Sequence, residues 1–215
     1  MKSLILKDLY NIRHNAKSML FILVVLAAVF ISTSGVEGYV NICAVMCSMM
    51  IVTTFAFDDS SKWARYAMIT PVSRKDLVAA KFIVLSIFCA IGSLFGLVIS
   101  VTAGLIMKQV PFGLAEFGEL LLLALAAWAI SFILGSISIP LVFKFGVEKG
   151  RVLLLVSFVV PAGMFFGIYQ TLVMLGVDIT DRLVFTLLCC SPIAAIVWCY
   201  AMYQISYRIF EKQEL

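Results

Sequence analysis

Long apolar stretches alternate with short polar ones along this chain of 215 residues. The apolar stretches cover about residues 18–34, 39–56, 77–106, 117–143, 152–175 and 183–206. Each is close to or above the ~20 residues that a helix needs to cross a bilayer. Because a spanning helix satisfies all its backbone groups internally, the pattern predicts an all-α integral membrane protein with six transmembrane helices, forming a single membrane domain over residues 1–215.

The composition supports a membrane protein. The chain is 63% hydrophobic and 13% charged, against about 45–50% and about 25% in soluble domains. No stretch is left over for a separate soluble domain.

The cysteines all lie inside apolar stretches, where they are expected to pack as small hydrophobic residues rather than form disulfides or bind a metal. They are Cys43, Cys47, Cys89, Cys189, Cys190 and Cys199.

Residues 1–17 are too polar to span a membrane and show a helical period instead. The apolar positions are Leu4 or Ile5, Leu9 and Ile12, set against the polar positions Lys2, Lys7, Asp8 and Arg13. This pattern predicts an amphipathic helix in the membrane interface before the first span. A secretory signal peptide is the alternative, but the apolar stretch is longer than a signal core and no Ala-x-Ala site follows. An uncleaved first helix is therefore expected.

The basic residues predict the orientation. With both termini in the cytoplasm, all 16 Lys and Arg residues except Lys108 and Arg182 fall on the cytoplasmic side. Cytoplasmic segments of membrane proteins are enriched in Lys and Arg. Both termini are thus expected inside.

The interiors of the spans hold almost no ionisable residues. Lys81 lies about one turn into the third span, where it is expected to snorkel to the interface, and Glu119 lies near the outer end of the fourth. Ion-coupled transporters keep charged groups at mid-membrane, so this class is disfavoured. The chain also lacks a phosphate-binding loop of the form Gly-x-x-x-x-Gly-Lys-Ser/Thr. Any energy source should therefore be a separate polypeptide, and this chain is expected to be non-catalytic.

The polar stretch 57–76 separates the second and third spans and carries several helix signals. Asp58 and Asp59 precede a Ser60-Ser61 pair that could cap a helix of about ten residues, ending before Pro71. The aromatic residues of this segment would lie at headgroup depth. Ser73 to Asp76 fits a capping box that starts the third membrane helix. The residues alone are equally compatible with a solvated interfacial loop.

Small residues recur at every fourth position in three spans and form ridges along which helix backbones approach closely. In the fourth span they are Ala127, Ser131 and Gly135. Of the other two ridges, the first is Gly92, Gly96, Ser100 and Gly104, and the second is Gly163 and Gly167. Either packing within one subunit or a seam between two subunits would use such ridges.

Two segments resemble the small type-2 ABC transporter permeases of Gram-positive bacteria. The first is the opening Met-x-x-Leu-x-x-Lys-Asp, and the second follows the second span and resembles the family pattern Leu-Pro-Val-Ser-Arg-x-x-Ile-Val-x-x-Lys. The matching positions here are Leu4, Lys7, Asp8, Phe57, Asp58, Lys62, Trp63, Tyr66, Pro71, Val72, Ser73, Arg74, Val78 and Lys81, with Thr70 in place of the usual Leu. The closest subgroup by pattern is the permease of phenol-soluble-modulin-type peptide exporters.

The resemblance implies a membrane subunit of an ATP-driven exporter in the bacterial plasma membrane. Two such subunits, alike or paired with a sister permease, would sit on two ATPase subunits that bind ATP and Mg²⁺, so no cofactor and no nucleic acid is expected on this chain. The segment after the second span would be the coupling helix that docks on the ATPase. The residues expected to carry coupling are Asp58, Asp59, Lys62, Trp63, Arg65, Tyr66, Arg74 and Lys75. Amphipathic or hydrophobic peptides are the expected cargo.

A membrane scaffold or immunity protein that sequesters a toxic peptide or recruits a partner is the alternative. Such a protein could use the same surface helix without an ATPase. Co-purification with an ATP-binding subunit distinguishes the two hypotheses.

Overall fold

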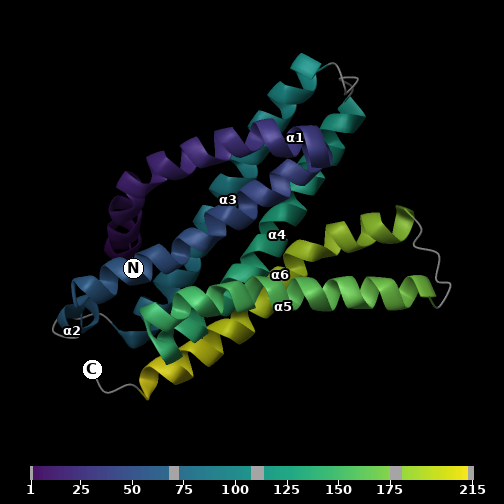
Figure 1. Ribbon diagram of the computed structural model, residues 1–215. Helices are drawn as coiled ribbons and strands as arrows, with labels where there is room; N and C mark the ends of the chain where they lie inside the picture. The colour runs from purple at the N-terminus through teal and green to yellow at the C-terminus, as the bar shows by residue number, and fades with distance from the viewer. Residues whose placement is uncertain (1, 68–72, 108–113, 175–180, 213–215) are drawn as a thin grey trace.

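The computed structural model describes residues 2–67, 73–107, 114–174 and 181–212, and these residues are helical apart from short turns. The helices are α1 (Lys2–Ser60), α2 (Trp63–Ala67), α3 (Arg74–Met107), α4 (Leu114–Phe145), α5 (Val147–Met174) and α6 (Asp181–Glu211). Figure 1 shows that the long helices form an elongated bundle, from which the later part of α5 and the first turns of α6 project. The predicted all-α class is confirmed for this part of the chain.

Helix α1 contains the first two apolar stretches, which are separated by a sharp break at Gly35. Gly35 has φ 74° and ψ 179°, a conformation that glycine adopts readily and other residues rarely do. On either side of it lie the apolar stretches Asn15–Thr33 and Gly35–Ser60. The hydroxyl of Tyr39, fully buried, donates to the Leu23 carbonyl at 2.8 Å and ties the two stretches together. The break falls in the gap, residues 35–38, between the first two apolar stretches of the sequence.

Within the described residues, five helical stretches are long and apolar enough to cross a membrane. Besides the two in α1, they are Arg74–Leu105, Phe117–Phe145 and Leu188–Glu211. In α5 the described residues contain a shorter apolar helix, Leu155–Met164. Since a helix of 28 residues is about 42 Å long, α5 has the length to span a bilayer. The chain is a multi-pass membrane protein, and the sixth span remains a prediction.

The small residues of α3 pack against the second half of α1. A Cβ placed on Gly92 would lie 2.7 Å from the Cys43 carbonyl oxygen, and one on Gly96 would lie 3.0 Å from the Val40 Cα. Ser100 donates its hydroxyl to the Val36 carbonyl at 2.9 Å, and Gly104 is buried as well. This ridge therefore serves close helix packing inside one chain.

The second ridge is open. Gly163 and Gly167 on α5 are exposed, and a Cβ on either would meet no described atom within 4 Å. Within the described residues this ridge contacts nothing, so a subunit seam along it remains a prediction.

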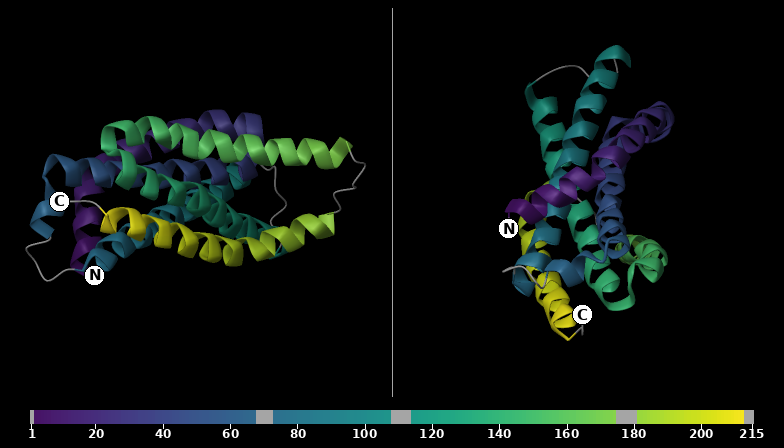
Figure 2. Two further views of the ribbon diagram at one scale, coloured as in Figure 1. Left: turned by 90° about the horizontal axis from the view of Figure 1, so that it is seen from below. Right: turned by 90° about the vertical axis from the view of Figure 1, so that its left-hand side faces the viewer.

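Both described ends of the chain lie at the same end of the bundle as α2. Figure 2 shows the first turns of α1, helix α2 and the last turns of α6 gathered there, with the start of α3 between them. In Figure 1 the first turns of α1 are set at a steep angle to the stretch that follows. Leu4 and Ile12 of these turns are buried in the main core cluster. The expected amphipathic N-terminal helix is thus present, packed on the bundle through one face.

Candidate functional site

A buried ion pair joins the first turns of α1 to α3. The side chains of Lys81 and Asp8 are 4% and 2% exposed, and Lys81 Nζ lies 2.9 Å from Asp8 Oδ2. Lys81 Nζ also donates to the hydroxyl oxygen of Thr54 at 3.2 Å. Its third close partner is Asp58, with Nζ 2.6 Å from Oδ2. All three of these polar partners are oxygen acceptors, and the Phe55 ring lies against the same ammonium group, with its centroid 4.8 Å from Nζ.

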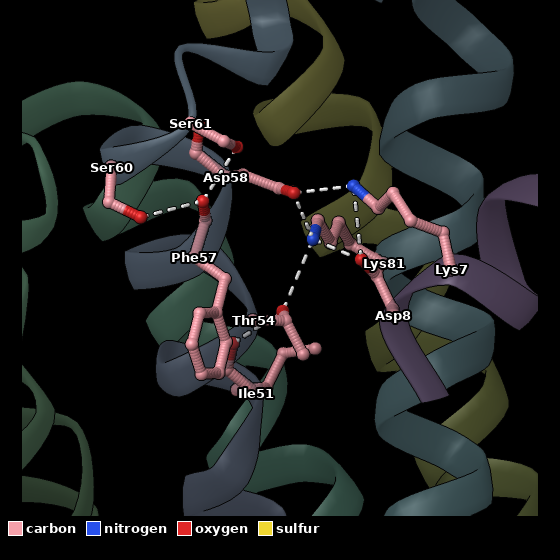
Figure 3. Close-up of polar contacts among 9 residues, drawn as sticks. All are labelled: Lys7, Asp8, Ile51, Thr54, Phe57, Asp58, Ser60, Ser61 and Lys81. Carbon is pink, nitrogen blue, oxygen red and sulfur yellow. Dashed lines mark hydrogen bonds and ion pairs between the residues drawn. The ribbon is translucent and has the colours of Figure 1, made fainter. Parts of the chain in front are cut away.

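Lys7 closes the pair into a ring of alternating charges (Figure 3). Its Nζ lies 3.2 Å from Asp8 Oδ1, outside hydrogen-bonding geometry, and also forms a short ion pair and hydrogen bond with Asp58 Oδ1. We call Lys7, Asp8, Asp58 and Lys81 the charge ring. Two ammonium groups and two carboxylates give it no net formal charge.

Neutrality explains why these groups tolerate burial. An isolated charge in a low-dielectric interior is strongly disfavoured, whereas alternating partners at 2.6–3.2 Å offset much of that cost. Asp58 also lies in the last turn of α1, where the helix dipole disfavours a carboxylate. The ammonium groups of Lys7 and Lys81 offset this unfavourable interaction with the helix dipole. The stability of the last turn of α1 is therefore expected to depend on these two lysines.

Two expectations from the sequence are wrong here. The sequence pattern places Asp8 on the polar face of the N-terminal helix, and it predicts that Lys81 snorkels to the interface. Both are buried, because Leu4, Asp8 and Ile12 share one face that packs inward and Lys81 finds two carboxylates within reach. The sequence does contain a sign of this burial. Leu4, Asp8 and Ile12 are spaced four residues apart and so lie on one helix face, with the acid between two apolar residues.

The serines after Asp59 end α1 rather than begin the surface helix. α1 continues through Ser60, so Asp58 and Asp59 occupy its last turn and not an N-terminal cap. The hydroxyls of Ser60 and Ser61 donate to the Phe57 carbonyl, at 3.0 and 2.8 Å, and so satisfy the free end of the helix. Lys62, with φ 51°, turns the chain. The predicted cap at this point is therefore wrong.

Helix α2 is short and is attached to the bundle by one face. It covers Trp63–Ala67 in the described residues, whereas the sequence predicted about ten residues; Thr70 and Pro71 lie outside the described part. Lys7 Nζ lies 4.5 Å from the centroid of the Trp63 ring, a cation–π contact. Ala67 is fully buried, while Tyr66 is 61% exposed. α2 thus rests on the charge ring through Trp63 and presents Tyr66 outward.

The start of α3 is fixed to the end of α6. The Ser73 hydroxyl accepts from the Asp76 backbone N–H at 3.1 Å, so the predicted cap is present. Arg74 donates to the carbonyls of Phe210 and Glu211 at 3.2 and 2.7 Å. A guanidinium at the C-terminal end of α6 also suits the helix dipole.

Replacing Arg74 with Gln should loosen the last turns of α6. Hydrogen bonds to charged groups contribute about 1.5–3 kcal/mol, so amide exchange in residues 205–211 should accelerate by about 10-fold or more. Hydrogen exchange with mass spectrometry measures this change. The control is Lys149→Gln, an exposed lysine in the first turn of α5. Equal exchange in both variants would contradict a capping role for Arg74.

The predicted coupling residues fall into two groups. Asp59, Lys62, Tyr66 and Lys75 are exposed, although Lys75 Nζ lies 5.4 Å from the Tyr207 ring centroid. Asp58, Trp63 and Arg74 are instead occupied by contacts within the chain. The side chain of Arg65 lies outside the described residues. Sequence reasoning missed Lys7, Asp8 and Lys81 as members of the same cluster.

A cavity opens beside the charge ring. It measures about 580 Å³ and lies between the end of α1, α2, the start of α3, the α4–α5 turn and the end of α6. Asp59 and Lys62 contribute to its lining, and so do Lys144 and Gly146 of the α4–α5 turn. Gly146, with φ 80°, allows the tight turn. The cavity separates α2 from the α4–α5 turn and leaves space for α2 to move.

Within the described residues no cluster of three metal-binding side chains occurs, and all six cysteines are free thiols. The polar contacts at this end of the bundle include those of the charge ring, the contact of Trp63 with Lys7 and the cap on α6.

Comparison with known families gives a match over nearly the whole chain. Residues 3–211 match the model of the ABC-2 family transporter protein. The chain belongs to the ABC-2 transporter family. Comparison with curated proteins gives no match. The chain is therefore an ABC-2 permease domain, and permeases of this family generally work with a partner ATPase.

The residues that carry the family resemblance converge in space. Lys7 and Asp8 come from the opening motif, and Asp58 and Lys81 from the second motif, some 50 to 73 residues further along the chain. The charge ring brings both motifs together beside α2. These four motif positions of the ABC-2 permease thus share one structural role.

Proposed function

We propose that this ABC-2 permease is the membrane subunit of an exporter driven by ATP hydrolysis on a separate chain. It has six spans with both termini in the cytoplasm, and pairs with a second permease, either a copy of itself or a sister chain. ATP and Mg²⁺ bind the partner ATPase. The single observation that carries the proposal is the seating of the exposed helix α2 on the charge ring, at the same end of the bundle as the N-terminal turns and the end of α6.

The docking surface comprises the exposed residues around α2. Asp59, Lys62 and Tyr66 form no ion pair with the described residues and are all exposed. An exposed aromatic side chain flanked by charges of both signs is typical of an interface centre with a polar rim. The exposed Tyr66 is therefore the proposed anchor for the ATPase.

The second group of residues transmits the movement. Trp63 contacts Lys7, and Asp58 pairs with both Lys7 and Lys81, so α2 contacts α1 directly and is linked to α3 through the charge ring. Arg74 extends the connection to α6. A displacement of α2 by the ATPase would therefore move the ends of three long helices, and the neighbouring cavity gives it space.

Replacing Tyr66 with Ala should weaken ATPase binding by 10-fold or more, since truncating an aromatic anchor costs about 2 kcal/mol or more. The measurement is affinity of the purified ATPase for the reconstituted permease. Tyr10→Ala is the matched control, because Tyr10 is equally exposed, at 65% against 61%, but lies on the N-terminal turns. Unchanged affinity in the Tyr66 variant would refute docking at α2. Absence of any ATPase after gentle purification would favour the scaffold or immunity alternative.

Amphipathic or hydrophobic peptides are the proposed cargo. In support, the spans contain no acidic residue or histidine at mid-membrane, and α5 and α6 expose many large apolar side chains. The narrower assignment to phenol-soluble-modulin-type exporters rests on the sequence resemblance alone. Stimulation of ATP hydrolysis in vesicles by amphipathic helical peptides, but not by polar peptides of equal length, would support this cargo class.

A further inference from the structure

An apolar groove lies inside the bend between the first turns of α1 and its first span. It measures about 370 Å³ and is bounded by both of these segments, by the second half of α1 and by α3. Leu9 and Met19 come from the two sides of the bend, and Met50 and Phe88 form the floor. We call it the elbow groove. Its volume falls in the range of about 300–1,000 Å³ that is usual for small-molecule sites.

The apolar lining of the elbow groove includes one cationic side chain, that of Arg13. Arg13 is the single charged residue of the groove, and it forms no ion pair or hydrogen bond with the described residues. The acid nearest in sequence, Asp8, is 2% exposed and committed to the charge ring. The groove therefore combines an apolar interior with an uncompensated guanidinium.

We propose that the elbow groove binds an anionic glycerophospholipid, with one acyl chain in the groove and the phosphate on Arg13. A guanidinium binds phosphate oxygens in a bidentate geometry that an ammonium group cannot match. The N-terminal turns are amphipathic and suited to the membrane interface, which places Arg13 at headgroup depth and the lining below it at acyl-chain depth. Basic pockets beside spans are suited to anionic headgroups.

A lipid fits this groove better than an amphipathic peptide does. A peptide helix would present several side chains and a polar backbone along its length, whereas the groove offers one charge and an apolar remainder. The proposal does not depend on export or on the cargo. It depends only on the groove lying at the membrane surface.

The test is native mass spectrometry of the full-length permease, delipidated in detergent and titrated with dioleoyl phosphatidylglycerol or dioleoyl phosphatidylcholine. The wild type should bind phosphatidylglycerol at least 5-fold more tightly. Arg13→Gln should abolish this preference, and Arg13→Lys should retain part of it. Ala16→Trp, which fills the groove, should weaken the binding of both lipids.

Lys17→Gln is the matched control, because Lys17 lies one turn further along the same helix, is exposed and does not line the groove. It should change either affinity by less than 2-fold. Equal binding of the two lipids by the wild type would overturn the proposal. So would an equal loss in the Lys17 variant, which would indicate a diffuse basic surface, or uptake of an amphipathic peptide with no lipid preference.

Discussion

Replacing Lys81 with methionine should destabilise the permease more than any other single change in the charge ring. Asp8 and Asp58 would keep only Lys7 as a partner, and breaking a buried ion pair on one side costs about 3–5 kcal/mol. For a chain of this length that corresponds to a fall of roughly 6–20 °C in the thermal unfolding midpoint. Thermal unfolding in mild detergent measures it.

The control for this variant is Lys75→Met, because Lys75 is an exposed lysine on the same helix. It should shift the midpoint by no more than a few degrees. The double variant Asp8→Asn/Lys81→Met should lose less stability than the two single variants added together, since removal of both charges leaves the Lys7–Asp58 pair intact. Strict additivity would show that Asp8 and Lys81 do not act as a pair.

The same variant separates docking from transmission. Lys81→Met leaves Asp59, Lys62 and Tyr66 untouched, so the permease should still bind its ATPase. Transport per ATP hydrolysed should fall, because α1, on which α2 rests, would lose its ion pairs to α3. Loss of ATPase binding instead would place Lys81 in the docking surface.

Replacing Gly92 with alanine should force α1 and α3 apart. The new methyl group would lie 2.7 Å from the Cys43 carbonyl oxygen and from the Cys47 Cβ, well inside contact distance. Overpacking of this kind costs about 1–3 kcal/mol, and here one of the atoms in the way is backbone, which cannot rotate aside. The thermal midpoint should fall accordingly.

Gly163→Ala is the matched control for this substitution. It is also an exchange of a helical glycine, but nothing described lies within 4 Å of the new Cβ. The gain in helix propensity of up to about 1 kcal/mol should make it neutral or slightly stabilising. An equal loss of stability at both positions would contradict close packing at Gly92. If the α5 ridge forms a subunit seam, Gly163→Ala should weaken self-association while leaving the monomer stable.

Local pattern alone predicted much of the fold. The apolar stretches predicted the long helices, the gap between the first two stretches is where α1 breaks at Gly35, and Ser73 predicted the start of α3. These features are set by residues within a few positions of one another. The family resemblance likewise rested on short motifs.

The charge ring could not be predicted in this way. Asp8 looks like a surface acid until Lys81, 73 residues later, is seen beside it. Nor does the local pattern show that α1 would continue through Asp58 and Asp59, because the carboxylate at its unfavourable end is stabilised by lysines from two other segments. Acids and lysines at positions that local rules disfavour were the only available sign of a long-range cluster.

The charge ring also sets an order of assembly. Lys81 is the last of its four members to leave the ribosome, and until then two carboxylates share Lys7 alone. The first turns of α1 and the end of its second apolar stretch therefore complete their ion pairs only when the third span is present. We expect the N-terminal half of the protein to become protease-resistant in one step, when the chain has grown past residue 81, rather than span by span.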